Sequence, residues 1–365
     1  MKCYLDYNAS APLLEEVKDV IISTLDIIGN PSSIHYEGRE AKKILEESRE
    51  DVANLVNADN NSVIFTSGAT EANNIVVNSF DTIIASNIEH ESILNNKNIL
   101  KVKVNSKGYV DLDFLNNLSY KLKNKKNVLI SIMHASNETG ILQPVKQVSK
   151  VAKKYNIPFH TDAVQAVGRV PVDFKKLDCD FLTISSHKIG GPKGAGALII
   201  KNKKKIKSFI VGGSQEYNLR AGTESLSTIA GFGKAAKSIN LKEMNNLKKL
   251  RDAFQTELLI ENKEIIIIGN HSERLPNTFM FCIPGINSNN ILIALDIEGF
   301  QVSTGSACSS GKVEPSKTLG AMGLPKNILN SSVRVSLGPY NNLNEAKRFA
   351  MAVKKIKNRF LNINQ

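Results

Sequence analysis

The sequence predicts an α/β protein whose main domain holds a mostly parallel sheet covered by helices, followed by a smaller α+β domain. Short apolar runs alternate with helical stretches up to about residue 240, as is typical of a parallel sheet with helices on both faces. Beyond that point strands and helices follow a different order. The 365 residues, 42% of them hydrophobic, are enough to form two domains.

The predicted strands of the main domain are short apolar runs, and they cover 63–66, 82–86, 128–134, 158–162, 181–185 and 196–200. Two of the stretches between them, 71–78 and 145–155, have the apolar spacing of helices. Two further helices are expected before the first strand. One begins at Pro12 and runs to residue 27, where Gly29-Asn-Pro-Ser-Ser33 breaks the pattern, and the other covers 37–56.

The second domain is expected to begin with a charged amphipathic helix at 241–259. It continues with predicted strands at 265–268, 278–282 and 332–337 and with predicted helices at 289–298 and 344–358. We therefore predict a large domain at 12–243 and a small domain at 244–365, which residues 1–11 complete.

Charge and composition restrict the class of protein. The net charge of +12 comes from lysines in runs such as 121–126 and 201–207, with no aromatic residues between them, so we expect a solvated surface and no nucleic-acid partner. No apolar run reaches the roughly 18 residues of a membrane span, and the first residues do not form a signal peptide. The four cysteines include no C-x-x-C pair, which indicates reduced thiols without a metal site. These features predict a cytoplasmic protein without a membrane partner.

Polar residues stand where predicted strands end, which is where open α/β sheets bind their ligands. Asp162 ends one strand, Lys188 follows another, and Thr66-Ser-Gly-Ala-Thr-Glu71 joins a strand to a helix. Taken alone, Asp162 could equally be an ordinary cap or a metal ligand, and Lys188 could be a surface cation. Together they suit a Schiff-base cofactor, with an amine, an acidic partner for a protonated ring nitrogen and a helix N-terminus for a phosphate. His134 and His160, which also end strands, are interpreted as core residues.

Ten short motifs follow one another along the chain. They are Leu5-Asp-Tyr-Asn-Ala9, Gly29-Asn-Pro-Ser-Ser33, Phe65-Thr-Ser-Gly-Ala-Thr-Glu71, Glu89-His90, His134-Ala-Ser-Asn-Glu-Thr-Gly140, His160-Thr-Asp-Ala-Val-Gln165, Ser185-Ser-His-Lys188, Arg220-Ala-Gly-Thr223, Ser303-Thr-Gly-Ser-Ala-Cys-Ser309 and Ser332-Val-Arg-Val-Ser-Leu337. In this order they resemble the motifs of the cysteine desulfurases, which are pyridoxal 5'-phosphate (PLP) enzymes of the class V aminotransferase group. The resemblance runs from Tyr4 to about Gly338 and implies the PLP-dependent transferase fold of type I.

The resemblance assigns roles around the cofactor. Lys188 would hold PLP through a Schiff base and then move the proton on the substrate Cα. Asp162 would pair with the ring nitrogen, Gln165 would hydrogen-bond the phenolic oxygen, and His90 would stack on the ring. The phosphate would be held by four residues of the same subunit and one from the second subunit of a homodimer, namely Ala69, Thr70, Ser185, His187 and the second subunit's Thr223.

Two residues would bind the substrate. Asn137, which also belongs to the cofactor site, and Arg334 would hold the carboxylate of L-cysteine, since a planar guanidinium matches a carboxylate with two hydrogen bonds.

Cys308 stands among serine, glycine and alanine, with no apolar neighbour against which to pack, whereas Cys282 lies in Phe279-Met-Phe-Cys-Ile283 and is interpreted as core. The residues alone allow either a nucleophile or an inert loop thiol at position 308. The resemblance makes Cys308 the nucleophile that takes sulfur from L-cysteine as a persulfide and leaves L-alanine.

Other functions stay open at this point. A selenocysteine lyase or another class V PLP enzyme is the alternative activity, although a transaminase needs no thiol at position 308. A basic binding protein that only kept the fold is disfavoured, because Lys188, Asp162 and His90 are all present.

The length of the predicted loop around Cys308 is similar to that of the branch that supplies iron–sulfur cluster assembly. A sulfur-acceptor protein such as an iron–sulfur scaffold is therefore expected as a partner, with tRNA or cofactor thiolation as other destinations. Housekeeping members carry a longer tail that helps dock the scaffold, whereas 31 residues (365 − 334) follow Arg334 here. Docking of a scaffold therefore stays an open question.

Overall fold

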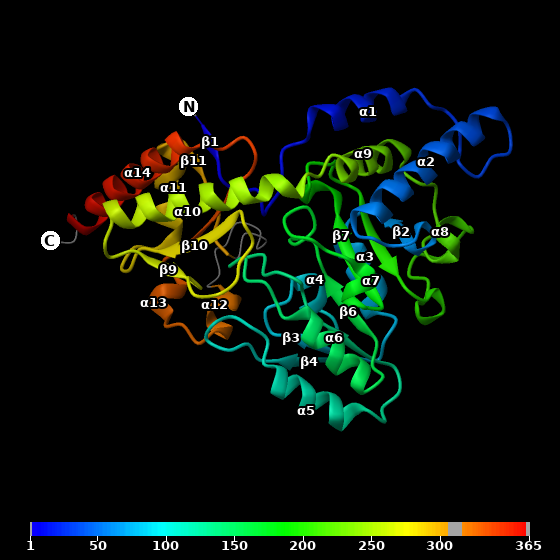
Figure 1. Ribbon diagram of the computed structural model, residues 1–365, viewed down its shortest axis with the longest axis horizontal. Coiled ribbons are helices and arrows are strands. Elements are labelled where there is room, and N and C mark those ends of the chain that lie inside the picture. The colour runs from blue at the N-terminus through cyan, green and yellow to red at the C-terminus, as the bar shows by residue number, and fades with distance from the viewer. Residues whose placement is uncertain (1, 306–315, 363–365) are drawn as a thin grey trace.

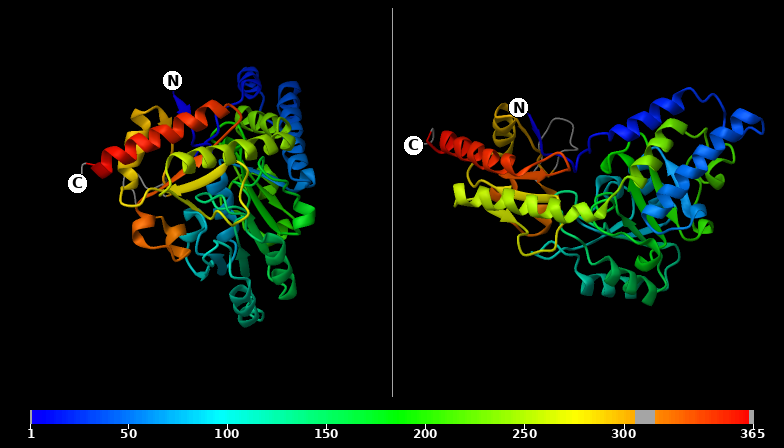
Figure 2. Two further views of the ribbon diagram at one scale, coloured as in Figure 1. Left: turned by 60° about the vertical axis from the view of Figure 1, so that its left-hand side comes forward. Right: turned by 45° about the horizontal axis from the view of Figure 1, so that its top comes forward.

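A computed structural model of the chain describes residues 2–305 and 316–362. It shows a large domain built on a seven-stranded sheet and a small domain built on a three-stranded sheet (Figure 1). The long helix α10 (Met244–Glu261) runs from the large domain into the small one, as the two views of Figure 2 also show. None of the described helices is long and apolar enough to span a membrane.

The large sheet has the strand order β2-β8-β7-β6-β5-β3-β4. Its strands are β2 (Val63–Thr66), β3 (Thr82–Ser86), β4 (Ile99–Val102), β5 (Val128–Ser131), β6 (Phe159–Asp162), β7 (Phe181–Ser185) and β8 (Gly196–Ile200). Only β8 runs antiparallel to its neighbours β2 and β7. Every strand except the edge strand β4 is buried along its whole length, because helices cover both faces. The predicted mostly parallel sheet is confirmed.

Helices pack on both faces of this sheet. On one side, α9 (Leu226–Lys237) packs against both α1 (Glu15–Leu25) and α2 (Tyr36–Leu55) (Figure 1). The remaining helices of this domain are α3 (Ala69–Val77), α4 (Glu91–Leu94), α5 (Leu112–Leu122), α6 (Val145–Lys154), α7 (Phe174–Leu177) and α8 (Gln215–Asn218). Short 3-10 turns add Asn60–Ser62, Ser186–Lys188, Lys203–Lys205 and Leu241–Glu243.

The small domain has an antiparallel sheet in the order β12-β10-β9. These strands are β9 (Ile266–Ile268), β10 (Thr278–Cys282) and β12 (Ser332–Ser336), with helices α11 (Ser288–Ile297), α12 (Lys317–Ala321), α13 (Lys326–Leu329) and α14 (Leu343–Asn362). The first strand of the chain, β1 (Cys3–Tyr4), pairs in parallel with β11 (Phe300–Gln301), and Leu5 is buried in the core of this domain. These contacts are consistent with the predicted boundaries at 11/12 and 243/244, which stay predictions.

Most predicted elements lie within a few residues of their predicted places, and the differences are at their ends. The predicted strand 128–134 stops at Ser131, although the next backbone N–H groups still bond β6, as Ile132 N does to His160 O at 3.1 Å. The first helix begins at Glu15 rather than at Pro12. Strand β4 and helix α5 were not predicted. Strand β4 is a partly exposed edge strand, and its four residues are too few to show a clear apolar pattern.

The core of the small domain is aromatic. Phe349 of α14 is fully buried, and its ring centroid lies 5.4 Å from that of Phe300, 5.8 Å from that of Phe254 and 5.9 Å from that of Phe281. Because these four residues come from two helices and two strands, Phe349 joins elements that are distant in the sequence.

We expect Phe349→Ala to lower the free energy of unfolding by about 3–5 kcal/mol, since it removes a buried ring and leaves a cavity. Urea unfolding of the purified protein measures this change. Met351→Ala is the matched control, because Met351 is on the same helix with 48% of its surface exposed, and it should change stability by less than about 0.5 kcal/mol. Equal losses for the two variants would contradict the prediction.

Candidate active site

A cavity of about 580 Å³ opens at the edge of the large sheet where the parallel strands end. Ten of the twelve residues singled out by the sequence line it, and they are Ala69, Thr70, His90, Asn137, Asp162, Gln165, Ser185, His187, Lys188 and Arg334. Thr223 does not line it, and Cys308 lies outside the described residues. The cavity also receives Asn8, Gly305 and Asn73, to which the sequence analysis gave no role.

Lys188 enters the cavity from the 3-10 turn Ser186–Lys188, which directly follows β7. Its Nζ donates hydrogen bonds to the carbonyl oxygens of Asn8 at 2.6 Å and Ala9 at 2.7 Å. The side chain is only half-buried, so the amine is held in place by the chain and still faces the cavity.

Asp162 is the last residue of β6, and its side chain is buried. One carboxyl oxygen accepts a hydrogen bond from Asn73 Nδ2 at 2.8 Å, and the other accepts one from the backbone N–H of Val164 at 3.0 Å. Asn73 also donates to Ser92 Oγ at 2.9 Å. The sequence analysis missed Asn73, although its place on α3, one turn after Ala69 and Thr70, was an available signal.

Helix α3 begins at the cavity wall with Ala69, and Gly68 before it provides no side-chain cap. The first N–H groups of a helix lack partners within the helix and favour an anion. The strand β8 passes close to this point, because a Cβ added at Gly196 would lie 2.7 Å from the Cα of Gly68. The backbone start of α3, with the Thr70 hydroxyl, therefore forms a polar cradle on the cavity wall.

The two histidines of the site differ in their surroundings. His90 directly precedes α4 and caps it, because its Nδ1 accepts a hydrogen bond from Ser92 N at 3.1 Å. The other ring nitrogen, Nε2, lies on the side of the ring away from this bond. The Nδ1 atom of His187 lies 3.3 Å from Ser10 Oγ. Burial, followed by the charge of nearby Lys188, lowers the pKa of His187 to about 4, so this ring is neutral near pH 7.

The amide of Gln165 has a defined orientation. Its Oε1 accepts a hydrogen bond from Arg169 Nη1, and its Nε2 donates to the carbonyl oxygen of Asn8 at 3.1 Å. Arg169 is buried, and it also donates hydrogen bonds to Gln165 O at 2.8 Å and to Tyr7 O at 3.2 Å. Burial lowers the pKa of Arg169 to about 9. The amide therefore has its NH₂ group on the cavity side, where it can donate a hydrogen bond. Arg169 was not predicted.

Arg334 reaches the opposite wall of the cavity from β12 of the small domain. Its Nη2 donates to Asp6 Oδ1 at 2.7 Å and its Nη1 to the carbonyl oxygen of Asn137 at 2.9 Å. Among the described residues its Nε has no hydrogen-bond partner, although the side chain is buried. A buried guanidinium with an unused donor suits a carboxylate ligand.

Glu89 lies behind the cavity wall, next to His90, and is buried. Its Oε1 accepts hydrogen bonds from Ser86 Oγ at 2.5 Å and from Met133 N at 2.9 Å, whereas its Oε2 has no partner among the described residues. Burial raises the pKa of Glu89 to about 8, so the carboxyl group is mostly protonated at pH 7.

These groups fit PLP. The cavity is of a size that holds a cofactor. It offers an amine at Lys188, a carboxyl group at Asp162 with an amide donor behind it, and a helix start with hydroxyl groups for a phosphate. When PLP is bound, Lys188, Asp162, Gln165 and His90 are the residues that would hold it.

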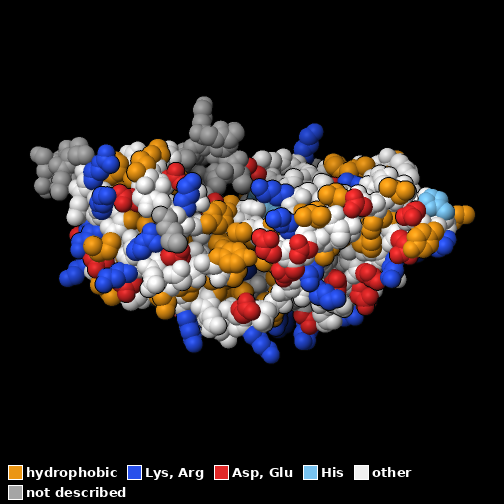
Figure 3. Space-filling model, turned by 90° about the horizontal axis from the view of Figure 1, so that it is seen from above, with side chains coloured by type: hydrophobic (Ala, Val, Ile, Leu, Met, Phe, Trp, Pro, Cys, Tyr) orange, Lys and Arg blue, Asp and Glu red, His pale blue; other side chains and the backbone are white. Residues whose placement is uncertain are grey.

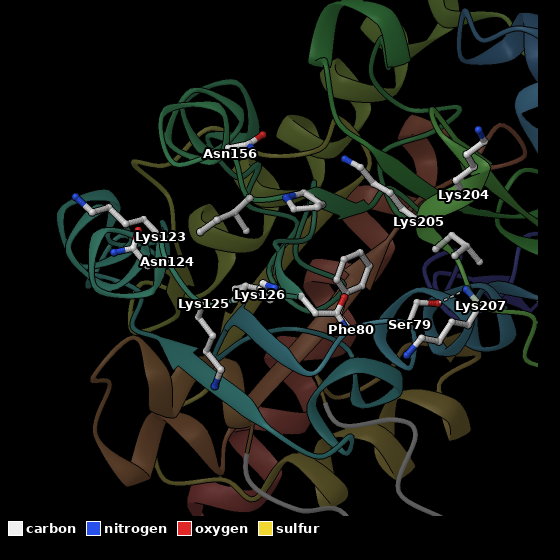
Figure 4. A pocket seen from close by; sticks show the side chains of 15 residues that line it. Ser79, Phe80, Lys123, Asn124, Lys125, Lys126, Asn156, Lys204, Lys205 and Lys207 are labelled. Carbon is white, nitrogen blue, oxygen red and sulfur yellow. Dashed lines mark hydrogen bonds between the residues drawn. The ribbon is translucent and has the colours of Figure 1, made fainter.

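A second hollow lies at the opposite end of the large sheet, and Figure 4 shows it. Its volume is about 550 Å³, and six lysines from the runs 121–126 and 201–207 surround it. In Figure 4, Lys123 and Lys125 point away from Lys204 and Lys205, and Lys205 pairs with Asp180 at 2.8 Å. The ammonium groups do not converge on one point, so the structure gives them no common ligand. Over residues 2–305 and 316–362, no cluster of histidine, cysteine and acidic residues could hold a metal ion.

Comparison with known proteins gives the family. The family model described as Aminotransferase class-V matches residues 3–349. The chain belongs to the class V aminotransferase family. Within this family it is similar to proteins named cysteine desulfurase: the cysteine desulfurase IscS of Dictyoglomus turgidum is 43% identical over 357 residues, which cover 92% of this chain and 90% of that protein. Class V aminotransferases are PLP-dependent, so the predicted fold and cofactor are confirmed.

Solved structures with a similar fold agree with this assignment. The X-ray structure of a NifS-like protein from Rickettsia africae superposes with a TM-score of 0.90 at 37% identity and covers 98% of this chain and 99% of its own. A structure titled SspA in complex with cysteine has a TM-score of 0.81 at 27% identity and covers 94% of this chain and 100% of its own.

We expect Glu89→Gln to gain stability relative to the wild type as pH rises from about 5 to about 8. Between its ordinary value of 4.5 and its folded value of about 8, the wild-type protein keeps a proton on Glu89 that the unfolded chain has lost. Unfolding then releases this proton, so wild-type stability falls as pH rises through this window, and glutamine has no such dependence.

Urea unfolding of both proteins in the same buffers at three pH values measures the difference, and groups that titrate equally in both cancel. A difference in free energy of unfolding that is constant from pH 5 to pH 8 would show that Glu89 is ionised in the folded protein.

Proposed function

We propose that this chain is a PLP-dependent cysteine desulfurase whose chemistry is carried out by Lys188, Asp162, Arg334 and Cys308. The observation that carries the proposal is that an amine, a buried carboxyl group and a buried guanidinium face one cavity. The similarity to proteins named cysteine desulfurase, and to a structure titled as a complex with cysteine, supports L-cysteine as the substrate.

PLP, when bound, supplies an electron sink for the electron pairs released at the substrate carbons. The residues do the rest. Arg334 binds the substrate carboxylate with its free Nε edge, while Asp6 and Asn137 hold its other nitrogens. Lys188 Nζ moves the proton on the substrate Cα. Asp162, held by Asn73, keeps a proton at the ring nitrogen, and Gln165 donates to the ring's oxygen.

The other three cysteines are unsuited to accept sulfur. Cys3, Cys179 and Cys282 are each at most 2% exposed, and burial raises the pKa of Cys3 to about 12, that of Cys282 to about 11 and that of Cys179 further still. A buried thiol that keeps its proton is a poor nucleophile. Cys308, which follows the cavity residue Gly305 by three positions, is therefore our proposed acceptor.

The transfer balances without an added oxidant. An S–S bond forms between the Cys308 sulfur and the substrate sulfur, and the Cβ–S bond of the substrate breaks. The substrate carbon gains the proton that the sulfur atoms give up. L-Cysteine and the Cys308 thiol become L-alanine and a Cys308 persulfide. The persulfide then passes its outer sulfur to an acceptor protein, for which an iron–sulfur scaffold in the cytoplasm is our expectation.

We also propose that the enzyme works as a homodimer. Exposed apolar side chains gather at the end of the molecule that carries α1 and α2 (Figure 3), among them Ile28 and Ile34, which are 87% and 91% exposed. Thr223 is exposed and is not in its own chain's cavity. Its segment is anchored to the first turn of α3, since Arg220 Nε donates to Glu71 Oε1 at 2.9 Å. A second copy that covers this end would bring its Thr223 to a neighbouring site.

We expect Cys308→Ser to retain the absorbance of bound PLP but to lower alanine release from L-cysteine by roughly 100-fold or more, because the nucleophile is lost. On addition of L-cysteine, the wild-type peptide that carries residue 308 should gain the mass of one sulfur atom, and the variant peptide should not. Coupled alanine detection and peptide mass spectrometry make these measurements.

Lys188→Ala is the matched control in the same cavity. Borohydride should fix PLP covalently to the peptide carrying Lys188 in the wild type and in Cys308→Ser, but leave Lys188→Ala unlabelled. Alanine release by Cys308→Ser at the wild-type rate would refute the assigned nucleophile. A wild-type protein that takes up no PLP would refute the enzyme assignment.

We expect subunits of Lys188→Ala and Thr223→Ala, each weakly active alone, to restore activity when they are mixed. A heterodimer has one site with both wild-type residues, so random exchange should return roughly a quarter of the wild-type rate. Mixing two batches of the same variant is the control. A fully active monomer by light scattering would contradict the shared site.

A further inference from the structure

Glu138 lies in the turn after β5, next to the cavity residue Asn137, and has no role in the chemistry described above. The turn is tightly held, because the Ser136 hydroxyl accepts hydrogen bonds from the N–H groups of Glu138 at 3.3 Å and Thr139 at 3.2 Å. The Asn137 carbonyl bonds Arg334 on the cavity side. The side chain of Glu138 points the other way, into the small domain, and is only 7% exposed.

The carboxyl group of Glu138 accepts two hydrogen bonds from the small domain. Thr318 Oγ1 donates to its Oε1 at 2.7 Å, and Ser316 Oγ donates to its Oε2 at 2.5 Å. The Ser316 hydroxyl also accepts a hydrogen bond from the backbone N–H of Leu319 at 3.0 Å and so caps α12. All these groups are buried, so loss of either partner would leave an unsatisfied polar group.

The same carboxyl group packs against Gly305. A Cβ added at Gly305 would lie 1.9 Å from Glu138 Oε2, so only glycine leaves room for this contact. The stretch before Gly305 is itself tied to the substrate-binding strand, because Ser303 exchanges two backbone hydrogen bonds with Arg334, at 2.7 and 3.2 Å. Gly305 also lines the cavity that holds Lys188.

One carboxyl group thus contacts the residue just before and the residues just after the segment 306–315, which carries Cys308. We propose that Glu138 is a positioning residue that holds both ends of this segment beside the cavity, so that the thiol of Cys308 reaches the substrate sulfur. This inference rests on the proposed role of Cys308. Misplacing a reacting group by about 1 Å can cost on the order of 100-fold in rate, so a distant anchor can have a large effect.

A nearby ion pair offers a control. Lys317 Nζ lies 3.0 Å from Glu91 Oε1 and also joins α12 to the large domain, but both side chains are about half exposed. A solvated pair of this kind contributes little to holding a segment in place. If any contact near α12 sufficed to place the segment, this pair would matter as much as Glu138.

The test compares Glu138→Ala, the double variant Ser316→Ala/Thr318→Val and their combination, with Glu91→Gln as control. We expect Glu138→Ala to lower kcat for alanine release by roughly 10- to 100-fold, with KM for L-cysteine and the PLP absorbance unchanged. In a single-turnover experiment, mass spectrometry measures how fast the peptide with residue 308 gains a sulfur atom. This rate should fall by the same factor. Glu91→Gln should change kcat by less than about twofold.

The double variant should reproduce most of this loss, and the combination should add little, because the three side chains act as one contact. Additive losses would overturn the proposal, as would a raised KM with unchanged kcat, which would place the effect at Arg334. If Glu138→Ala fails to fold, the double variant alone tests the proposal. A double variant that gains sulfur on the peptide with residue 308 at the wild-type rate would then refute it. Failure of the proposed function is seen separately, in a Cys308→Ser protein that still releases alanine normally.

Discussion

The geometry of the cavity depends on the hydrogen bonds made by the segment 5–9. Lys188 of the large domain donates to the carbonyl oxygens of Asn8 and Ala9. Arg334 of the small domain donates to Asp6, and the Asn8 side chain bonds Thr278 of β10 at 3.0 Å. Asn8, Thr278 and Arg334 are buried, so their polar groups would be costly to leave unpaired. The relative positions of the Lys188 amine and the Arg334 guanidinium at the cavity are therefore set by one short stretch of chain.

Polar groups buried around this stretch are kept neutral or paired. His160 lies between Ser131 Oγ at 2.8 Å and Thr183 Oγ1 at 3.0 Å, and burial lowers its pKa to about 4, which confirms the sequence interpretation of a core residue. Farther from the cavity, Arg49 and Glu216 form a buried two-bond ion pair. Separating the partners in such groups would leave a buried charge or donor uncompensated, which disfavours rearrangement around them.

The sequence was a good guide to the elements and to the residues facing the cavity, and a poor guide to what supports them. Asp162 and Lys188 were found because the carboxyl ends of parallel strands meet at one edge. Asn73 and Arg169 were missed, since their importance comes from contacts to Asp162 and Gln165 that helix periodicity does not show. Glu138 was quoted inside a motif but given no role, because its partners lie 178 and 180 residues away.

By itself, the sequence determined most of the order of strands and helices and, through its motifs, the family, because periodicity and short motifs are local properties of the chain. The tertiary structure decided which groups are paired, which are neutral and which lie side by side. It put Arg334 against Asp6, 328 residues away, and left Thr223 outside its own chain's cavity. These outcomes depend on burial and on contacts between distant segments, which lower the local dielectric and fix the partners only once the two domains have packed together.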